Sequence, residues 1–92
     1  MTGAVAFVGT LAIFATLRQV AGTDHHDLDD VDTVGAALQH NARLWDAVVP
    51  DGELVPGTIV LVNGPNIHHL QGLATPLQDG DRVSVFPAVG GG

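Results

Sequence analysis

Apolar, β-branched segments lie near both ends of this chain, and the only clear helical pattern lies between them. Residues 4–14 are almost uncharged and rich in Val, Ile, Phe and Thr, which predicts one or two buried strand segments. Gly9 marks either a bulge or the true start of the strand. Turn-forming residues at 19–24 then lead to residues 25–31, which are typical of a short second strand with a polar outer face. Together these segments predict an N-terminal hairpin.

The helical pattern begins at Asp32 and Thr33, whose side chains can accept hydrogen bonds from the amides of a first helical turn. Apolar residues then recur near helical spacing, and this pattern is interrupted at Asn41. The apolar positions are Val34, Ala37, Leu38, Trp45 and Val48. The helix is expected to end before Pro50, because proline disfavours the helical conformation in the residue before it. The sequence therefore predicts one continuous helix and no other.

Two more strands are predicted in the last third of the chain. Residues 58–62 form a β-branched run that ends at Asn63-Gly64, a dipeptide suited to a tight turn with positive φ angles. A loop over residues 67–77 and a turn over residues 78–81 lead to residues 82–86, where apolar and polar positions alternate. One helix packed across one face of a mixed sheet would bury both apolar patterns, so the predicted fold class is α+β.

Length and composition are those of one domain. With 92 residues, of which 46% are apolar and 14% charged, the chain is too hydrophobic to be disordered and long enough for one core. The absence of cysteine excludes disulfides, thiolate metal sites and cysteine nucleophiles. The apolar start lacks the positive charge of a secretory signal and is shorter than the roughly 20 residues that span a bilayer, so we expect a cytoplasmic protein with no membrane partner.

The formal net charge is −7, and the cationic side chains are three arginines, Arg18, Arg43 and Arg82. A negative surface repels phosphate backbones, so we expect no nucleic-acid partner and favour basic proteins. The acidic run at residues 24–32 does not fit a calcium loop, because Asn41 falls where a bidentate Glu is needed. We interpret the run as a solvated acidic face.

Four of the five histidines occur as two adjacent pairs, His25-His26 and His68-His69. Adjacent residues on a strand face opposite sides, so one pair is poorly placed to hold one metal ion, and no cysteine assists. We interpret all four as surface histidines and predict no metal site.

Several short runs carry a resemblance to a known family. They are Val-Leu-Val-Asn-Gly at 60–64, Leu-Ala-Thr-Pro-Leu-Gln-Asp-Gly-Asp at 73–81 and Val-Ser-Val-Phe-Pro-Ala-Val at 83–89, before a terminal Gly-Gly. With Ile-Phe-Ala-Thr-Leu-Arg at 13–18, they resemble the MoaD/ThiS family of sulfur carriers, which includes the small subunit of molybdopterin synthase. The resemblance implies a ubiquitin-like β-grasp fold, with a mixed sheet of four to five strands on one main helix. It also implies a single domain over residues 1–92, with residues 88–92 as a flexible tail.

In the family that this chain resembles, the chemistry occurs at the C-terminal carboxylate, here that of Gly92. The resemblance implies that an adenylating enzyme of the MoeB/ThiF type uses ATP and Mg²⁺ to form an acyl-adenylate, which a sulfur donor converts to a thiocarboxylate. Glycine, which has no Cβ, suits a tail that must enter a narrow channel. The chain supplies no general base, nucleophile or metal, so we expect a carrier with no bound cofactor rather than an enzyme.

The residues that lead to Gly92 are predicted to contact the partner proteins, namely Phe86, Pro87, Ala88, Val89, Gly90 and Gly91. Pro87 has no amide donor and should end strand pairing. Phe86 is expected to point away from the side of Val83 and Val85, either as a docking contact or as a ring folded onto the sheet edge. Gly90 departs from the family, in which a different residue precedes the Gly-Gly.

The leading hypothesis is a sulfur carrier in molybdopterin (molybdenum cofactor) biosynthesis, working with a large subunit of the MoaE type. A carrier for thiamin, cysteine or tRNA thiolation would have the same fold and tail, so those features do not separate the pathways. Two alternatives stay open. One is a ubiquitin-like modifier joined through Gly92 to lysines of target proteins, and the other is an interaction module with an inert tail.

Overall fold

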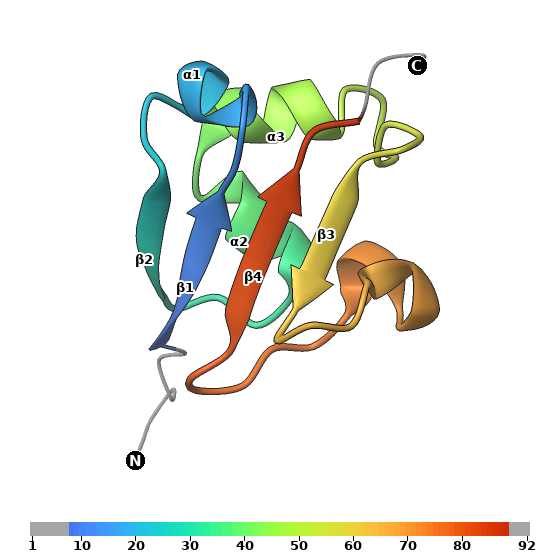
Figure 1. Ribbon diagram of the computed structural model, residues 1–92. Helices are drawn as coiled ribbons and strands as arrows, with labels where there is room; N and C mark the ends of the chain where they lie inside the picture. Colours follow the sequence, from blue (N-terminus) through green and yellow to red (C-terminus); the bar gives the residue numbers. More distant parts are fainter. Residues whose placement is uncertain (1–7, 89–92) are drawn as a thin grey trace.

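The first and last strands lie side by side in the middle of a mixed sheet (Figure 1). The computed structural model describes residues 8–88. Within them β1 (Val8–Ile13) and β4 (Arg82–Phe86) run parallel. β2 (His25–Asp29) pairs antiparallel with β1, and β3 (Ile59–Val62) pairs antiparallel with β4, which gives the order β2-β1-β4-β3. The predicted α+β class and mixed sheet are confirmed, with four strands in the described part of the chain.

The predicted single helix is wrong, because the stretch divides into α2 (Val34–Gln39) and α3 (Ala42–Val48). Thr33 caps α2 as predicted, its hydroxyl oxygen accepting from the amide of Ala36 at 3.2 Å. Asn41 caps α3 in the same way, its side-chain oxygen accepting from the amide of Leu44 at 3.0 Å. The backbone of Asn41 is extended, so the residue that interrupts the apolar pattern also interrupts the helix. The end of α3 before Pro50 is as predicted.

A further helix that the sequence did not reveal, α1 (Leu17–Ala21), occupies part of the predicted hairpin turn. It ends at Gly22, whose φ of 81° lies in the left-handed region and whose amide donates to the carbonyl of Arg18 at 2.9 Å. Only Leu17 of α1 is buried. The predicted loop over residues 67–77 likewise contains two 3₁₀ turns, η1 (Ile67–His69) and η2 (Gly72–Ala74).

The helices pack against one face of the sheet, and the other face is left open (Figure 1). Alternate strand residues point toward the helices, and together with α2 and α3 they form one buried cluster whose largest members are Leu11, Ile13, Leu28, Leu38, Leu44, Val34, Val48, Val60, Val83 and Val85. Trp45 packs partly buried against this cluster. Burial of each such aliphatic side chain contributes about 1.5–3 kcal/mol to folding.

Two turns fix the start of β4. Asn63 and Gly64 adopt φ angles of 58° and 125°, as the dipeptide predicts. The Asn63 side chain donates to the Asp81 carboxylate and accepts from the amide of Arg82, both at 2.8 Å. The turn after β3 is therefore hydrogen-bonded to the turn before β4, and these bonds fix the register of β4 against β3.

Candidate functional site

The parallel pairing of β1 and β4 brings two phenylalanines together at the end from which the tail leaves the fold. Ile13 is opposite Val85 in the register, and the amide of Phe14 donates to the carbonyl of Val85 at 3.1 Å. The rings of Phe14 and Phe86 consequently stack, with centroids 4.4 Å apart and planes 13° from parallel. Both side chains are half-buried. Phe86 is on the other face of β4 from the buried Val85, as the alternation predicts.

Of the two alternatives for Phe86, a ring folded onto a sheet edge does not fit the structure, because β4 lies between β1 and β3, and the docking contact stays a prediction. Phe86 is instead covered on one side by Phe14, whose ring in turn lies 5.6 Å from the guanidinium carbon of Arg18. Arg18 is oriented by a hydrogen bond of 2.9 Å from its Nε to the carbonyl of Ile13. We call Phe14, Phe86 and Arg18 the aromatic cluster. Aromatic residues, phenylalanine included, and arginine are enriched at protein interfaces relative to the rest of the surface.

The tail leaves the sheet directly beside this cluster. β4 ends at Phe86, and Pro87 and Ala88 follow as half-buried residues. A Cβ added to Gly57 would lie 3.2 Å from the Cβ of Ala88, so the loop before β3 touches the base of the tail. The remaining predicted site residues, Val89, Gly90, Gly91 and Gly92, lie outside the described residues.

Phe14, Arg18 and Gly57 were not among the predicted site residues. Phe14 ends the first apolar segment and Phe86 ends the last. Parallel pairing of those two segments would have placed the phenylalanines together, but the sequence does not state which strands pair. Gly57 faces Ala88 only because the chain folds back at the loop before β3.

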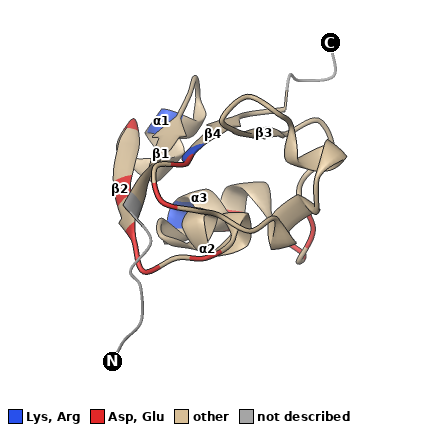
Figure 2. Cartoon of the chain, turned by 90° about the horizontal axis from the view of Figure 1, so that it is seen from below, with Lys and Arg blue, Asp and Glu red and all other residues tan. Residues whose placement is uncertain are grey.

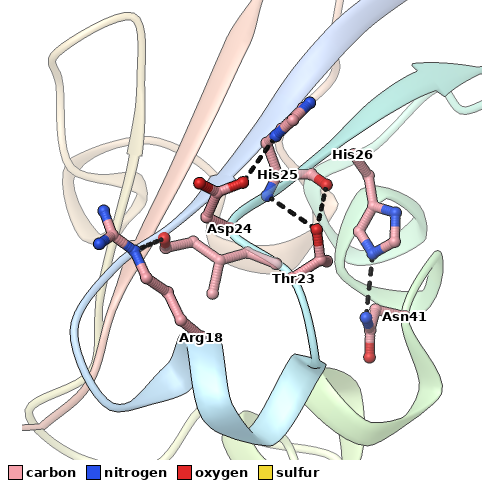
Figure 3. A network of polar contacts seen from close by, with 7 residues as sticks. Arg18, Thr23, Asp24, His25, His26 and Asn41 are labelled. Atoms are coloured by element: carbon pink, nitrogen blue, oxygen red, sulfur yellow. Dashed lines mark hydrogen bonds and ion pairs between the residues drawn. The ribbon is translucent and has the colours of Figure 1, made fainter.

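A polar network lies at the same end of the sheet (Figure 3). His25 is exposed and pairs with Asp24 at 2.8 Å, which raises the pKa of the imidazole and lowers that of the carboxyl. His26 differs from a free surface histidine. It is half-buried, its Nε2 lies 2.9 Å from the Nδ2 of Asn41, and its ring lies 4.9 Å from that of His40. Burial and the neighbouring His40 lower the pKa of His26.

The orientation of the Asn41 amide settles which atom donates to His26. Its oxygen accepts from the amide of Leu44, and its nitrogen donates to the carbonyl of Ala21 at 3.0 Å. Neither partner can exchange roles, so Nδ2 is the donor toward His26 and the histidine Nε2 must be unprotonated to accept. Asn41 thus links α1, β2 and α3.

Acidic residues lie along β2 and on the loop that follows it (Figure 2). Within residues 8–88 no group of three or more His, Cys, Asp or Glu side chains is arranged to hold a metal ion. In the same part of the chain, no helix is long and apolar enough to cross a membrane.

Comparison with known proteins gives this geometry a family context. The model of the ThiS family matches residues 11–92. The small archaeal modifier protein 3 of Haloferax volcanii is 44% identical over 88 residues, which cover 89% of this chain and 96% of the relative. The molybdopterin synthase sulfur carrier subunit of Escherichia coli is 37% identical over 83 residues, which cover 86% of this chain and 93% of that subunit. The sulfur carrier protein CysO of Mycobacterium tuberculosis is 33% identical over 91 residues, which cover 90% of this chain and 97% of CysO.

Solved structures agree with the sequence comparison. The crystal structure of small archaeal modifier protein 1 from H. volcanii superposes with a TM-score of 0.75 at 33% identity, over 90% of this chain and 99% of the other. The BexX/CysO complex of Amycolatopsis orientalis contains a chain that superposes with a TM-score of 0.72 at 25% identity, over 91% of this chain and 99% of that one. By their names these relatives are carriers and modifiers rather than enzymes. The chain belongs to the ThiS family of ubiquitin-like sulfur carriers and protein modifiers.

Proposed function

We propose that the carboxylate of Gly92 is the reactive group of this protein and that a partner enzyme activates it. A MoeB/ThiF-like enzyme joins the carboxylate to AMP from ATP in the presence of Mg²⁺, and pyrophosphate leaves. Sulfide supplied by a sulfur donor then attacks the acyl carbon and AMP leaves, so that Gly92 ends in a thiocarboxylate. The observation that carries this proposal is that the family match runs through residue 92, six residues after β4 ends at Phe86, a member of the aromatic cluster.

The aromatic cluster supplies the docking surface in this proposal. Phe86, Pro87 and Ala88 connect that surface to the tail, so a protein bound at the stacked rings would receive Val89, Gly90, Gly91 and Gly92 next to it. The chain then contributes position rather than catalysis, since the partner holds the carboxylate against the phosphate.

For the sulfur acceptor we propose a pterin precursor of molybdopterin, with a MoaE-like subunit as the receiving protein. The 37% identity with the E. coli molybdopterin synthase carrier supports this choice. A second candidate is protein modification, in which Gly92 is joined to lysines of other proteins. It is favoured by the 44% identity with a relative named as a modifier, and the absence of lysine from this chain would prevent lysine-linked chains of its own kind.

Intact mass spectrometry tests the activation step. The chain is incubated with its adenylating enzyme, ATP, Mg²⁺ and a sulfide source, and the wild type is expected to gain the mass of one sulfur-for-oxygen exchange. Gly92→Ala should react more slowly because its Cβ crowds the channel, whereas Gly52→Ala, which lies outside the predicted site residues and has nothing within 4 Å, serves as the control. An unchanged wild-type mass with an enzyme that is active on another carrier would refute the proposal.

The acceptor is tested in cells. Deletion of the gene should abolish molybdoenzyme activity, and the wild-type gene but not one ending at residue 91 should restore it. Immunoblots that show heavier, Gly92-dependent adducts while molybdoenzyme activity is unaffected would assign the chain to protein modification instead.

A further inference from the structure

A hollow of about 290 Å³ lies on the open face of the sheet, next to the aromatic cluster. Its lining includes Thr10 and Ala12 of β1, with Phe14, Arg18, His25 and Arg82 around them. The register places Arg82 beside Thr10 and His25 beside Ala12. Ala12 is only 5% exposed although it alternates with the core residues Leu11 and Ile13, because larger side chains stand around it. We call this depression the arginine hollow.

The arginine hollow concentrates positive charge on an acidic protein. Arg18 and Arg82 are two of the three arginines in a chain of formal net charge −7. Among the described residues neither guanidinium forms an ion pair, since the one ion pair found there joins His25 to Asp24. Arg18 uses its Nε on the carbonyl of Ile13, and the rest of its guanidinium makes no hydrogen bond within residues 8–88.

The one carboxylate that lines the hollow, that of Asp24, is already engaged by His25. The pairing raises the pKa of His25, so the imidazole carries more positive charge near neutral pH than an isolated histidine would. Asp27, which lies beside Thr10 in the register, also acts on His25, so the two carboxylates of Asp24 and Asp27 both lie near the imidazole. The guanidiniums of Arg18 and Arg82 remain without an ion-pair partner within residues 8–88.

The chemistry of the lining indicates what the hollow binds. A guanidinium presents parallel N–H groups that match the two oxygens of a carboxylate, and such charge-assisted bonds are about twice as strong as neutral ones. We propose that the arginine hollow receives an aspartate or glutamate side chain of the adenylating enzyme when that enzyme docks on the aromatic cluster. The inference rests on the proposed function and adds a polar, orienting contact to the apolar one.

Charge reversal at Arg82 tests the hollow with a matched control. The Arg82 amide, which donates to Asn63, is retained in any variant, so the turn before β4 is preserved. Arg82→Glu and Arg43→Glu change the net charge equally, but Arg43 is an exposed residue of α3, on the helix side of the sheet. Calorimetric titration of the adenylating enzyme is expected to give roughly tenfold weaker binding for Arg82→Glu and less than about twofold for Arg43→Glu.

A second pair of variants keeps the test valid if charge reversal disturbs folding. Arg82→Gln should lose most of the affinity and much of its dependence on salt, whereas Arg82→Lys, which keeps the charge without the planar fork, should fall between Gln and wild type. Circular dichroism confirms that each variant is folded. Equal affinities for wild type and Arg82→Gln would overturn the proposal.

Two further outcomes separate this inference from the proposed function. Normal adenylation of the wild type with equal losses in Arg82→Glu and Arg43→Glu would overturn the hollow alone. A wild type that neither binds the enzyme nor gains AMP would overturn both. Titration of the isolated chain with ATP provides the last arm, because binding that Arg82→Gln abolishes would assign the hollow to a phosphate and refute the carboxylate.

Discussion

Asn41 joins three elements through one side chain, so its replacement is expected to cost more than the loss of a helix cap. In Asn41→Ala the amide of Leu44 loses its acceptor, and Ala21 and His26 lose their donor. The cap contributes about 1 kcal/mol. The two other hydrogen bonds add about 0.5–1.5 kcal/mol each. Because the site is half-buried we take the lower part of the range, and expect a loss of about 2–3 kcal/mol in the free energy of unfolding.

Thr33→Ala is the matched comparison. It removes the cap of α2, a single hydrogen bond to Ala36, and should cost about 1 kcal/mol. Urea titration can be followed by the fluorescence of Trp45, the only tryptophan, which packs against the core from α3. The midpoint should fall further for Asn41→Ala than for Thr33→Ala with no change in the slope. In thermal melts each kcal/mol corresponds to about 4–8 °C for a domain of this size.

Equal destabilisation by Asn41→Ala and Thr33→Ala would refute this reasoning. It would mean that the contacts with Ala21 and His26 contribute nothing, and that Asn41 acts only as a cap.

Three other variants probe the pH response, the docking surface and the base of the tail. His26 has a lowered pKa in the folded chain, so as the pH falls the unfolded chain binds a proton before the folded chain does. Stability should therefore fall as the pH drops from about 6.5 toward the lowered pKa. His26→Gln should make this loss smaller in melts recorded at several pH values. Phe14→Ala should leave a folded protein that the adenylating enzyme binds about tenfold more weakly in calorimetric titrations. Gly57→Ala combines a φ of +91° with a close approach to Ala88, so it should lower the melting temperature and slow adenylation in a pyrophosphate-release assay.

Each of these variants has a control of the same chemical type. His69→Gln should keep the wild-type pH response, and an unaltered response in His26→Gln would contradict the role assigned to its neutral imidazole. Leu70→Ala removes a 46% exposed apolar side chain from outside the aromatic cluster and should leave binding unchanged; equal losses would deny the cluster a special role. Gly52→Ala has a φ of +83° with nothing within 4 Å, so it shares the strain and should not slow adenylation.

Local pattern predicted the strands well. The boundaries of β4 agree with the predicted residues 82–86, and β3 differs from its prediction by one residue. β3 is a β-branched run between Gly57 and Gly64, and β4 alternates between apolar and polar residues from the Gly80 turn to Pro87. The preference of Asn63 and Gly64 for positive φ is a property of those residues themselves, so no distant contact was needed to predict that turn.

The helices show where local pattern fails. The apolar positions of α2 and α3 stay nearly in phase across Asn41, so they are indistinguishable from one helix until the side chain of Asn41 is seen to bind Leu44 and Ala21. The five residues of α1 are too few to show a period. The aromatic cluster depends on the pairing of the first strand with the last, and spacing within either strand carries no information about that pairing.

The pairing of β1 with β4 also determines when the molecule can be completed during folding. These strands come from opposite ends of the described chain, and loop closure over such a separation is entropically costly and slow. β1 and β2 can associate early as neighbours, but the middle of the sheet stays open until β4 inserts between β1 and β3. The stacking of Phe86 on Phe14 depends on this pairing, so the surface beside the tail is absent until the first and last strands have come together. A partner that recognises the stacked rings would thereby distinguish a finished carrier from a nascent or unfolded one.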